Sequence, residues 1–169
     1  PLIVRKVQIP WNPEAGFGAV AWNGEVFLNE DLMGRLGLTT EEVEAAIRKA
    51  RANVRERMRR FSSATPFPDS RHHSCILVDD GLASGYTMTA AARALRNQKP
   101  RRIVVAVPTG SLAAVERIAD LVEEVICLNV RSGYSFAVAD AYEEWYDLTE
   151  EEALRLLREA ALRGLGVRG

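Results

Sequence analysis

Apolar and polar residues alternate in blocks along the second half of the chain. Short apolar runs stand at 75–78 (CILV), 103–107 (IVVAV) and 125–130 (VICLNV). Helical periodicity follows each of the first two runs, at 87–96 and at 111–122. Continuous apolar strands that alternate with helices are typical of a parallel sheet covered by helices on both faces. The pattern therefore predicts an α/β fold.

The first half of the chain follows a different pattern. Residues 2–7 (LIVRKV) read as a strand, and residues 18–29 predict a β-hairpin that turns at the Asn-Gly pair 23–24. Apolar residues spaced by four and three predict a helix over 39–61, and Glu42 completes a capping box at its start. We interpret this hairpin and helix as an elaboration inserted between core strands.

One more helix is predicted near the end of the chain. Thr149 and Glu152 carry the signature of a capping box, and Leu154, Leu157 and Ala161 recur on one side of the helix that would follow. Neither an internal repeat nor a domain boundary is recognised. The whole chain is therefore expected to form a single domain.

Composition narrows the range of partners. The 169 residues include 22 Lys and Arg against 23 Asp and Glu, so the formal charge of −1 gives no global attraction to nucleic acid. No apolar stretch approaches the roughly 20 residues of a membrane span. The predicted long helix has a basic face, for which a solvated surface is favoured over nucleic-acid binding. Two cysteines in apolar runs and no signal pattern make the cytoplasm the expected compartment.

The stretch CILVDDGLASGYT, residues 75–87, interrupts the apolar pattern with two acids and several small residues. In a parallel α/β sheet ligands bind beyond the carboxyl ends of the strands, which is where this stretch begins. Its glycines allow a tight turn, and a helix beginning near Thr87 would direct free N–H groups at the loop. Such a loop suits a phosphate, with the Ser84 and Thr87 hydroxyls as further donors.

Asp79 and Asp80 indicate a different ligand group. Carboxylates repel a phosphate, but they accept hydrogen bonds from sugar hydroxyls and they also suit a hydrated divalent cation. Together with the loop, they predict a site for a phosphorylated sugar with magnesium.

These residues resemble a known motif. VDDGLASGYTM, residues 78–88, is similar to the phosphoribosylpyrophosphate (PRPP) motif of type I phosphoribosyltransferases. The resemblance extends to VRK at 4–6, to RRIVVAVPTGS at 101–111 and to FAVADAYEEWYDLTEEEALRLL at 136–157, which are similar to an uncharacterised bacterial and archaeal subfamily. It covers most of the chain and implies a parallel sheet flanked by helices.

The resemblance also implies roles for individual residues. Asp79 and Asp80 would be the catalytic pair, binding the ribose hydroxyls and holding Mg²⁺ through water. The basic pair Arg5 and Lys6 would face pyrophosphate. The 5-phosphate of PRPP, or of ribose 5-phosphate, would be bound by Gly81, Leu82, Ala83, Ser84, Gly85, Tyr86 and Thr87. Tyr134 and Phe136 would stack on the acceptor, for which local packing is the alternative.

The family reaction transfers phosphoribose from PRPP to a nitrogenous acceptor such as a nucleobase and releases pyrophosphate. Ala83 stands where enzymes for 6-oxopurines have an aspartate, so that acceptor class is disfavoured. A complete member has a strand and a pyrophosphate loop before the stretch that begins at Pro1. An N-terminally incomplete domain, or a regulatory module that binds ribose phosphates without catalysis, is therefore the alternative expectation. A homodimer is the oligomer expected for this fold.

Overall fold

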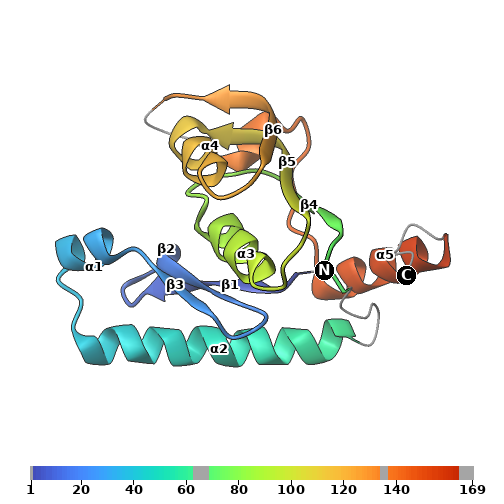
Figure 1. Ribbon diagram of the computed structural model, residues 1–169. Helices are drawn as coiled ribbons and strands as arrows, with labels where there is room; N and C mark the ends of the chain where they lie inside the picture. The colour runs from blue at the N-terminus through green and yellow to red at the C-terminus, as the bar shows by residue number, and fades with distance from the viewer. Residues whose placement is uncertain (1, 63–68, 134–136, 164–169) are drawn as a thin grey trace.

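The computed structural model describes residues 2–62, 69–133 and 137–163 (Figure 1). Its elements follow the predicted order, with two short helices added. The strands are β1 Val4–Ile9, β2 Asn12–Ala21, β3 Val26–Leu28, β4 Ser74–Val78, β5 Arg102–Ser111 and β6 Glu124–Arg131. The helices are α1 Glu30–Leu36, α2 Thr40–Ser62, α3 Tyr86–Arg96, α4 Leu112–Ala119, the 3₁₀ helix η1 Val138–Ala141 and α5 Glu150–Leu162.

The strands form two sheets of three. Strands β4, β5 and β6 are parallel, as predicted, whereas β1, β2 and β3 form an antiparallel sheet. LIVRKV contains a strand, as predicted, but this strand belongs to the antiparallel sheet and not to the parallel one, since β1 pairs with β2 through Val4↔Ala21 and Val7↔Gly18. Only two residues separate β1 from β2, and such a connection allows a hairpin but not the long crossover that parallel strands need.

Local signals in the first half act as the sequence predicts. Gly24 turns the β2–β3 hairpin with φ of 87°. The capping box of α2 is formed, with Thr39 N donating to Glu42 Oε2 at 2.9 Å and Glu42 N donating to Thr39 Oγ1 at 3.2 Å. The seven-residue helix α1 has no counterpart among the predictions, because it is too short for a periodic pattern. Asn29 caps its start and Gly37, with φ of 64°, caps its end.

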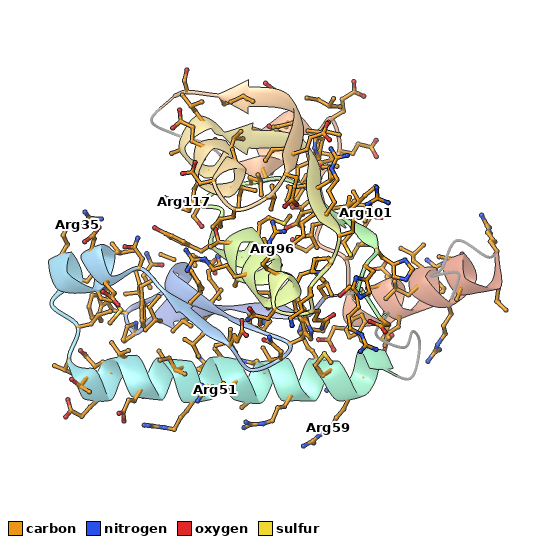
Figure 2. The ribbon with its side chains drawn as sticks, viewed as in Figure 1. Arg35, Arg51, Arg59, Arg96, Arg101 and Arg117 are labelled. Atoms are coloured by element: carbon orange, nitrogen blue, oxygen red, sulfur yellow. The ribbon has the colours of Figure 1, made fainter. Side chains whose placement is uncertain are left out.

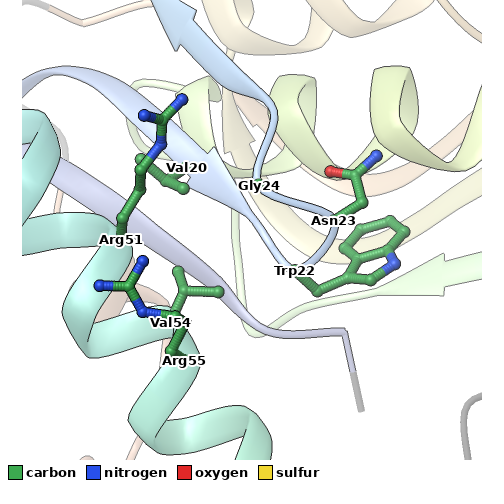
Figure 3. A pocket seen from close by; sticks show the side chains of 7 residues that line it. All are labelled: Val20, Trp22, Asn23, Gly24, Arg51, Val54 and Arg55. Carbon is green, nitrogen blue, oxygen red and sulfur yellow. The ribbon is translucent and has the colours of Figure 1, made fainter.

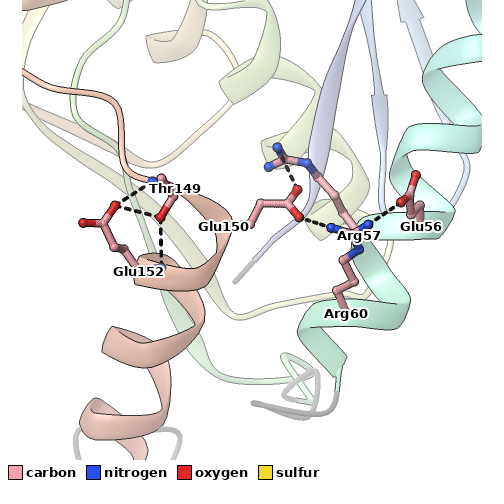
Figure 4. Close-up of polar contacts among 6 residues, drawn as sticks. All are labelled: Glu56, Arg57, Arg60, Thr149, Glu150 and Glu152. Atoms are coloured by element: carbon pink, nitrogen blue, oxygen red, sulfur yellow. Dashed lines mark hydrogen bonds and ion pairs between the residues drawn. The ribbon is translucent and has the colours of Figure 1, made fainter.

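Helix α5 begins at its predicted capping box and is attached to α2 by ion pairs (Figure 4). Glu150 accepts from Arg57 at 3.0 Å and from Arg60 at 2.5 Å. Leu154 and Leu157 pack against the core around α2, whereas Ala161 is exposed. The apolar side of α5 is therefore shorter than predicted, since its last turn extends past the core.

Helix α3 lies between the two sheets (Figure 1). Seven of its residues are buried: Met88, Thr89, Ala90, Ala91, Ala92, Ala94 and Leu95. Small side chains allow α3 to pack closely on β1 and β2. On its other side, Met88, Ala91, Ala92 and Leu95 share an apolar core with the parallel sheet. Trp22 contacts both apolar cores.

Helices α3 and α4 cover only one face of the parallel sheet. On the other face Ile76, Val78 and Leu128 are 64%, 74% and 83% exposed, so within the described residues the expected cover on both faces is incomplete. The strand order β4-β5-β6 explains this. Two successive right-handed crossovers that add strands in the same direction place both helices on the same side.

Gly18 fixes the spacing between β2 and β3. A Cβ atom on this residue would lie 2.1 Å from the carbonyl oxygen of Phe27, which is backbone and cannot rotate away. We expect Gly18→Ala to lower the free energy of unfolding by about 1–3 kcal/mol, measured by urea denaturation, because β3 must move. Gly34→Ala in α1 is the control: it meets nothing within 4 Å and should be neutral or stabilising by up to about 1 kcal/mol. Equal effects of the two substitutions would contradict the steric argument.

Candidate active site

The loop between β4 and α3 is fixed by the end of β5 and by α4. Its carbonyl groups are bound in sequence: Leu82 O by Ser111 N at 2.9 Å, Ala83 O by Ser111 Oγ at 2.7 Å, and Ser84 O by Arg117 Nη1. In a planar trans peptide the C=O of one residue and the N–H of the next point in opposite directions. The N–H groups of residues 83–85 therefore point away from Ser111 and Arg117. Leu82 was also among the predicted phosphate ligands, but its N–H donates to Thr109 O at 2.9 Å and is thus already bonded within the protein.

The start of α3 continues this row of donors. Gly85 adopts the left-handed conformation, with φ of 76°, and supplies no side-chain acceptor to the first turn. The N–H groups that open a helix lack intrahelical partners and carry its positive dipole end. Free N–H groups at a loop and a helix start are the kind of donors that bind phosphate in proteins, and Thr87 belongs to the first turn of this helix.

Asp79 and Asp80 follow the last residue of β4 and remain exposed. Loss of hydration raises the pKa of Asp79, and the neighbouring charge of Asp80 raises it further. Loss of hydration also raises the pKa of Asp80, although hydrogen bonding from the Gly81 N–H opposes the shift. Two carboxylates held close together at a structural cost are typical of a functional site.

The segment after β6 folds back over the beginning of this loop. Val138 packs so closely on Gly81 that a Cβ there would lie 2.8 Å from Val138 Cγ1. Tyr142 donates its hydroxyl hydrogen to Asp80 O at 2.7 Å. The charge of Asp147 contributes to the raised pKa of Asp80. The backbone at the acidic end of the loop is therefore contacted by a segment far away in sequence.

Arg5 and Lys6 line a cavity of about 820 Å³ that also reaches Thr87, Lys49 and Asp147. The structure thus brings the predicted basic pair to the same cavity as the end of the phosphate loop. Lys6 donates to Glu14 O at 2.8 Å. Successive residues of a strand point to opposite faces, so the two basic side chains leave β1 on different sides.

Arg5 lies among charges of α2 and α5. Loss of hydration lowers its pKa, the nearby Arg57 lowers it further, and Glu150 opposes both effects. Arg5 is therefore half-buried next to a second guanidinium and one carboxylate, a surrounding that favours an added anion.

The carboxylates at the loop could hold Mg²⁺ only if water and substrate supplied its other ligands. No group of three or more His, Cys, Asp or Glu side chains within the described ranges is arranged to hold a metal ion. Two adjacent carboxylates can nevertheless hold a hydrated Mg²⁺ whose other ligands come from substrate oxygens, the usual arrangement for this ion. Tyr134 and Phe136, the predicted acceptor-stacking residues, lie outside the part of the chain that the structure describes.

A second cavity of about 420 Å³ lies between α2 and the β2–β3 turn (Figure 3). It is lined by Val20, Trp22, Asn23, Gly24, Arg51, Val54 and Arg55. On the same helix Arg48 pairs with Glu44 at 3.4 Å and Arg60 with Glu56 at 2.7 Å, as is usual on an exposed helix surface. These ion pairs fit the interpretation of the basic face of α2 as a solvated surface.

Sequence reasoning missed several residues around the loop. Ser111 was identified only as a helix start, and Arg117, Tyr142 and Asp147 were given no role. Figure 2 places Arg117 on the side of α4 that faces α3. No local pattern marks these residues, because each reaches the loop from an element distant in sequence. The nearest signal is their position in or beside RRIVVAVPTGS and FAVADAYEEWYDLTEEEALRLL.

Comparison with known proteins identifies the family. The profile described as "Phosphoribosyl transferase domain" matches residues 19–147, which is more than half of the chain and includes the whole loop. The chain belongs to the phosphoribosyl transferase family. The matched range of this phosphoribosyl transferase domain begins after Arg5 and Lys6, so the match bears on the loop and not on the basic pair.

Two curated relatives of this phosphoribosyl transferase domain come from two strains of Mycobacterium tuberculosis, and their names begin "Putative phosphoribosyl transferase". Each is 31% identical over 159 residues, 94% of this chain. The chain spans 36% of the length of these relatives. The crystal structure of TT1426 from Thermus thermophilus is similar, with a TM-score of 0.72 and 34% identity over 94% of this chain and 74% of that one. These findings confirm the family and fold expected from VDDGLASGYTM.

The length and composition of the helices can be compared with those of a membrane span. Over the residues that the structure describes, no helix combines the length and the apolar character needed to cross a bilayer.

Proposed function

We propose that this domain binds PRPP together with Mg²⁺ and transfers its phosphoribosyl group to a nitrogenous acceptor such as a nucleobase, releasing pyrophosphate. The observation that carries the proposal is the loop itself. The carbonyl groups of residues 82–84 accept hydrogen bonds from Ser111 and Arg117, so the N–H groups of residues 83–85 point to the opposite side of the loop. Two carboxylates follow the end of the strand that leads into this loop. Phosphate at the N–H groups and ribose at the carboxylates account for all of these features.

Each part of PRPP can be assigned to a group of residues in this arrangement. The 5-phosphate would accept hydrogen bonds from the N–H groups of residues 83–87 and from the Thr87 hydroxyl. Asp79 and Asp80 would accept hydrogen bonds from the 2- and 3-hydroxyls of ribose and so orient its ring. The cavity at Arg5 and Lys6 extends from Thr87 and would receive the pyrophosphate.

The transfer breaks the bond between C1 of ribose and the pyrophosphate oxygen, whose electron pair leaves with pyrophosphate. A lone pair of the acceptor nitrogen forms the new bond to C1, and the proton of that nitrogen is lost to solvent. Asp79 and Asp80 would hold Mg²⁺ through water, and the ion would supply charge neutralisation for the pyrophosphate. Positive charge develops on the ribose ring in the transition state, and the two carboxylates would stabilise it.

Calorimetric titration with PRPP tests the proposal. We expect saturable binding in the presence of Mg²⁺ and much weaker binding when EDTA removes the metal. Ribose 5-phosphate should bind more weakly than PRPP, because it lacks the pyrophosphate that Arg5 and Lys6 would contact. Absence of PRPP binding under both conditions would contradict the proposal.

A second assay separates catalysis from binding alone. Released pyrophosphate is measured with PRPP, Mg²⁺ and a panel of nucleobases. Release that requires one acceptor would support the transferase. Tight PRPP binding with no release from any acceptor would favour the alternative, a module of this fold that binds ribose phosphates.

A further inference from the structure

Arg117 of α4 makes two contacts with the proposed phosphate loop. Its guanidinium donates to Ser84 O, and it lies over the ring of Tyr86 at 4.8 Å from the ring centre. Within the described ranges, Arg117 forms no ion pair with a carboxylate. Its charge thus stays directed at the loop rather than being neutralised by an acidic side chain.

Ser111 holds the loop from the end of β5. Its hydroxyl donates to Ala83 O at 2.7 Å and accepts from Ala114 N at 3.2 Å, while its own N–H donates to Leu82 O at 2.9 Å. One residue therefore binds two successive loop carbonyls and also caps α4. The orientation of the loop is in this way determined by the start of the neighbouring helix.

Tyr86, which contacts Arg117, also hydrogen-bonds to a residue in the first half of the chain. The amide group of Asn29 hydrogen-bonds to the Tyr86 hydroxyl, and the Asn29 side-chain oxygen caps α1 by accepting from Leu32 N at 3.0 Å. The first residue of α3 is thereby held between Arg117 on one side and the end of β3 on the other. Rotation of the α3 N-terminus would break both contacts.

We propose that Arg117 and Ser111 are positioning residues that keep the N–H groups of residues 83–85 directed at the 5-phosphate. The ligand named here rests on the proposed function. Without Arg117, the Ser84 carbonyl is free to rotate, and its rotation carries the Gly85 N–H away from the ligand. The guanidinium also adds a positive charge on the carbonyl side of the loop, and this charge favours an anion at the N–H groups on the opposite side.

Ribose 5-phosphate is the probe, because it carries the 5-phosphate without pyrophosphate. In Arg117→Met we expect its dissociation constant to rise about 10- to 100-fold, the range for a lost hydrogen bond to a charged group. Arg117→Lys keeps the charge but not the planar stacking group and should recover part of the affinity. Arg93→Met is the matched control: Arg93 also lies over an aromatic ring, that of Phe27 at 3.8 Å, but touches no loop carbonyl. The affinity of Arg93→Met for ribose 5-phosphate should equal that of the wild type.

Amide NMR spectra provide a readout that a loss of general stability would not change. In the wild type the amide signals of residues 83–87 should shift on addition of ribose 5-phosphate, and in Arg117→Met these shifts should shrink while other signals stay in place. Ser111→Ala, which removes only the donor to Ala83 O and the α4 cap, provides a second variant with the same expected direction if Arg117→Met does not fold.

Two results would overturn the proposal, and they differ. Equal affinity in the wild type, Arg117→Met and Ser111→Ala would remove the positioning role and leave the proposed function intact. No binding of ribose 5-phosphate or PRPP by the wild type would contradict the proposed function and this role together.

Discussion

Replacing Asp79 and Asp80 together by asparagine is expected to abolish measurable PRPP binding in the presence of Mg²⁺. Asparagine keeps the size of the side chain but removes the charge that attracts the hydrated cation and strengthens hydrogen bonds from ribose hydroxyls. Each such bond contributes about 1.5–3 kcal/mol, so two lost bonds weaken binding by at least about 100-fold. Calorimetric titration with PRPP and Mg²⁺ measures the effect.

The fold should survive this double substitution. Both aspartates have pKa values raised by loss of hydration, so at neutral pH their ionised forms make the folded state less stable than it would be with neutral side chains. The free energy of unfolding of the asparagine variant should therefore equal or exceed that of the wild type. Asp120→Asn, at the C-terminal end of α4, is the control and should change neither binding nor turnover. Retained PRPP affinity in the double variant would rule out the aspartates as ribose and metal ligands.

The raised pKa values also set the direction of a pH effect. In the proposed function the carboxylates would bind ribose and cation only when ionised, and a raised pKa means that protonation begins at a higher pH than for an ordinary aspartate. PRPP affinity should therefore decline as the pH is lowered toward these values. Because the asparagine variant is expected to have no measurable affinity for PRPP, the control is Asp120→Asn, which keeps both aspartates and should show the same decline as the wild type.

Gly85→Ala is expected to damage both stability and phosphate binding. Gly85 has φ of 76°, where an alanine costs about 1–2 kcal/mol. The added Cβ would also lie 3.1 Å from Ala114 Cβ and 3.4 Å from Ala114 Cα, so α3 and α4 must separate slightly. We expect a loss of about 1–3 kcal/mol in the free energy of unfolding and at least a ten-fold loss in affinity for ribose 5-phosphate, because the N–H groups of the loop move.

Gly24→Ala separates the two causes. Gly24 has a similar positive φ of 87° in the β2–β3 turn, but a Cβ there meets nothing within 4 Å. This control should show the backbone cost alone and leave ligand affinity unchanged. If Gly85→Ala bound ribose 5-phosphate as tightly as Gly24→Ala, the close approach of α3 and α4 would have no part in binding.

Local signals predicted most of the elements correctly. The capping boxes at Thr39 and Thr149, the Asn-Gly turn and the apolar runs of β4, β5 and β6 depend on residues adjacent in sequence or one helical turn apart. Each of them encodes a hydrogen bond or a periodic contact within the same element. VDDGLASGYTM likewise combines a strand end, a tight turn and a helix start in one continuous stretch, so its geometry could be predicted before the structure.

Pairing across the chain could not be predicted in the same way. The sequence of β1 fits either a parallel or an antiparallel partner, because its apolar residues are the same in both cases. Only the two-residue connection to β2 decides between them, and the strand expected there began six residues later than the observed one. The roles of Ser111 and Arg117 depend on where α4 packs, and no pattern of neighbouring residues encodes that packing.

The position of α3 has a consequence for the thermodynamics of the whole molecule. Its N-terminus belongs to the proposed anion site, while its buried alanines pack between the two sheets. A ligand that binds only the folded molecule stabilises it by mass action, in proportion to the logarithm of its concentration above the dissociation constant. Because unfolding of either sheet would remove the support of α3, phosphate bound at one end of this helix should protect both sheets against heat.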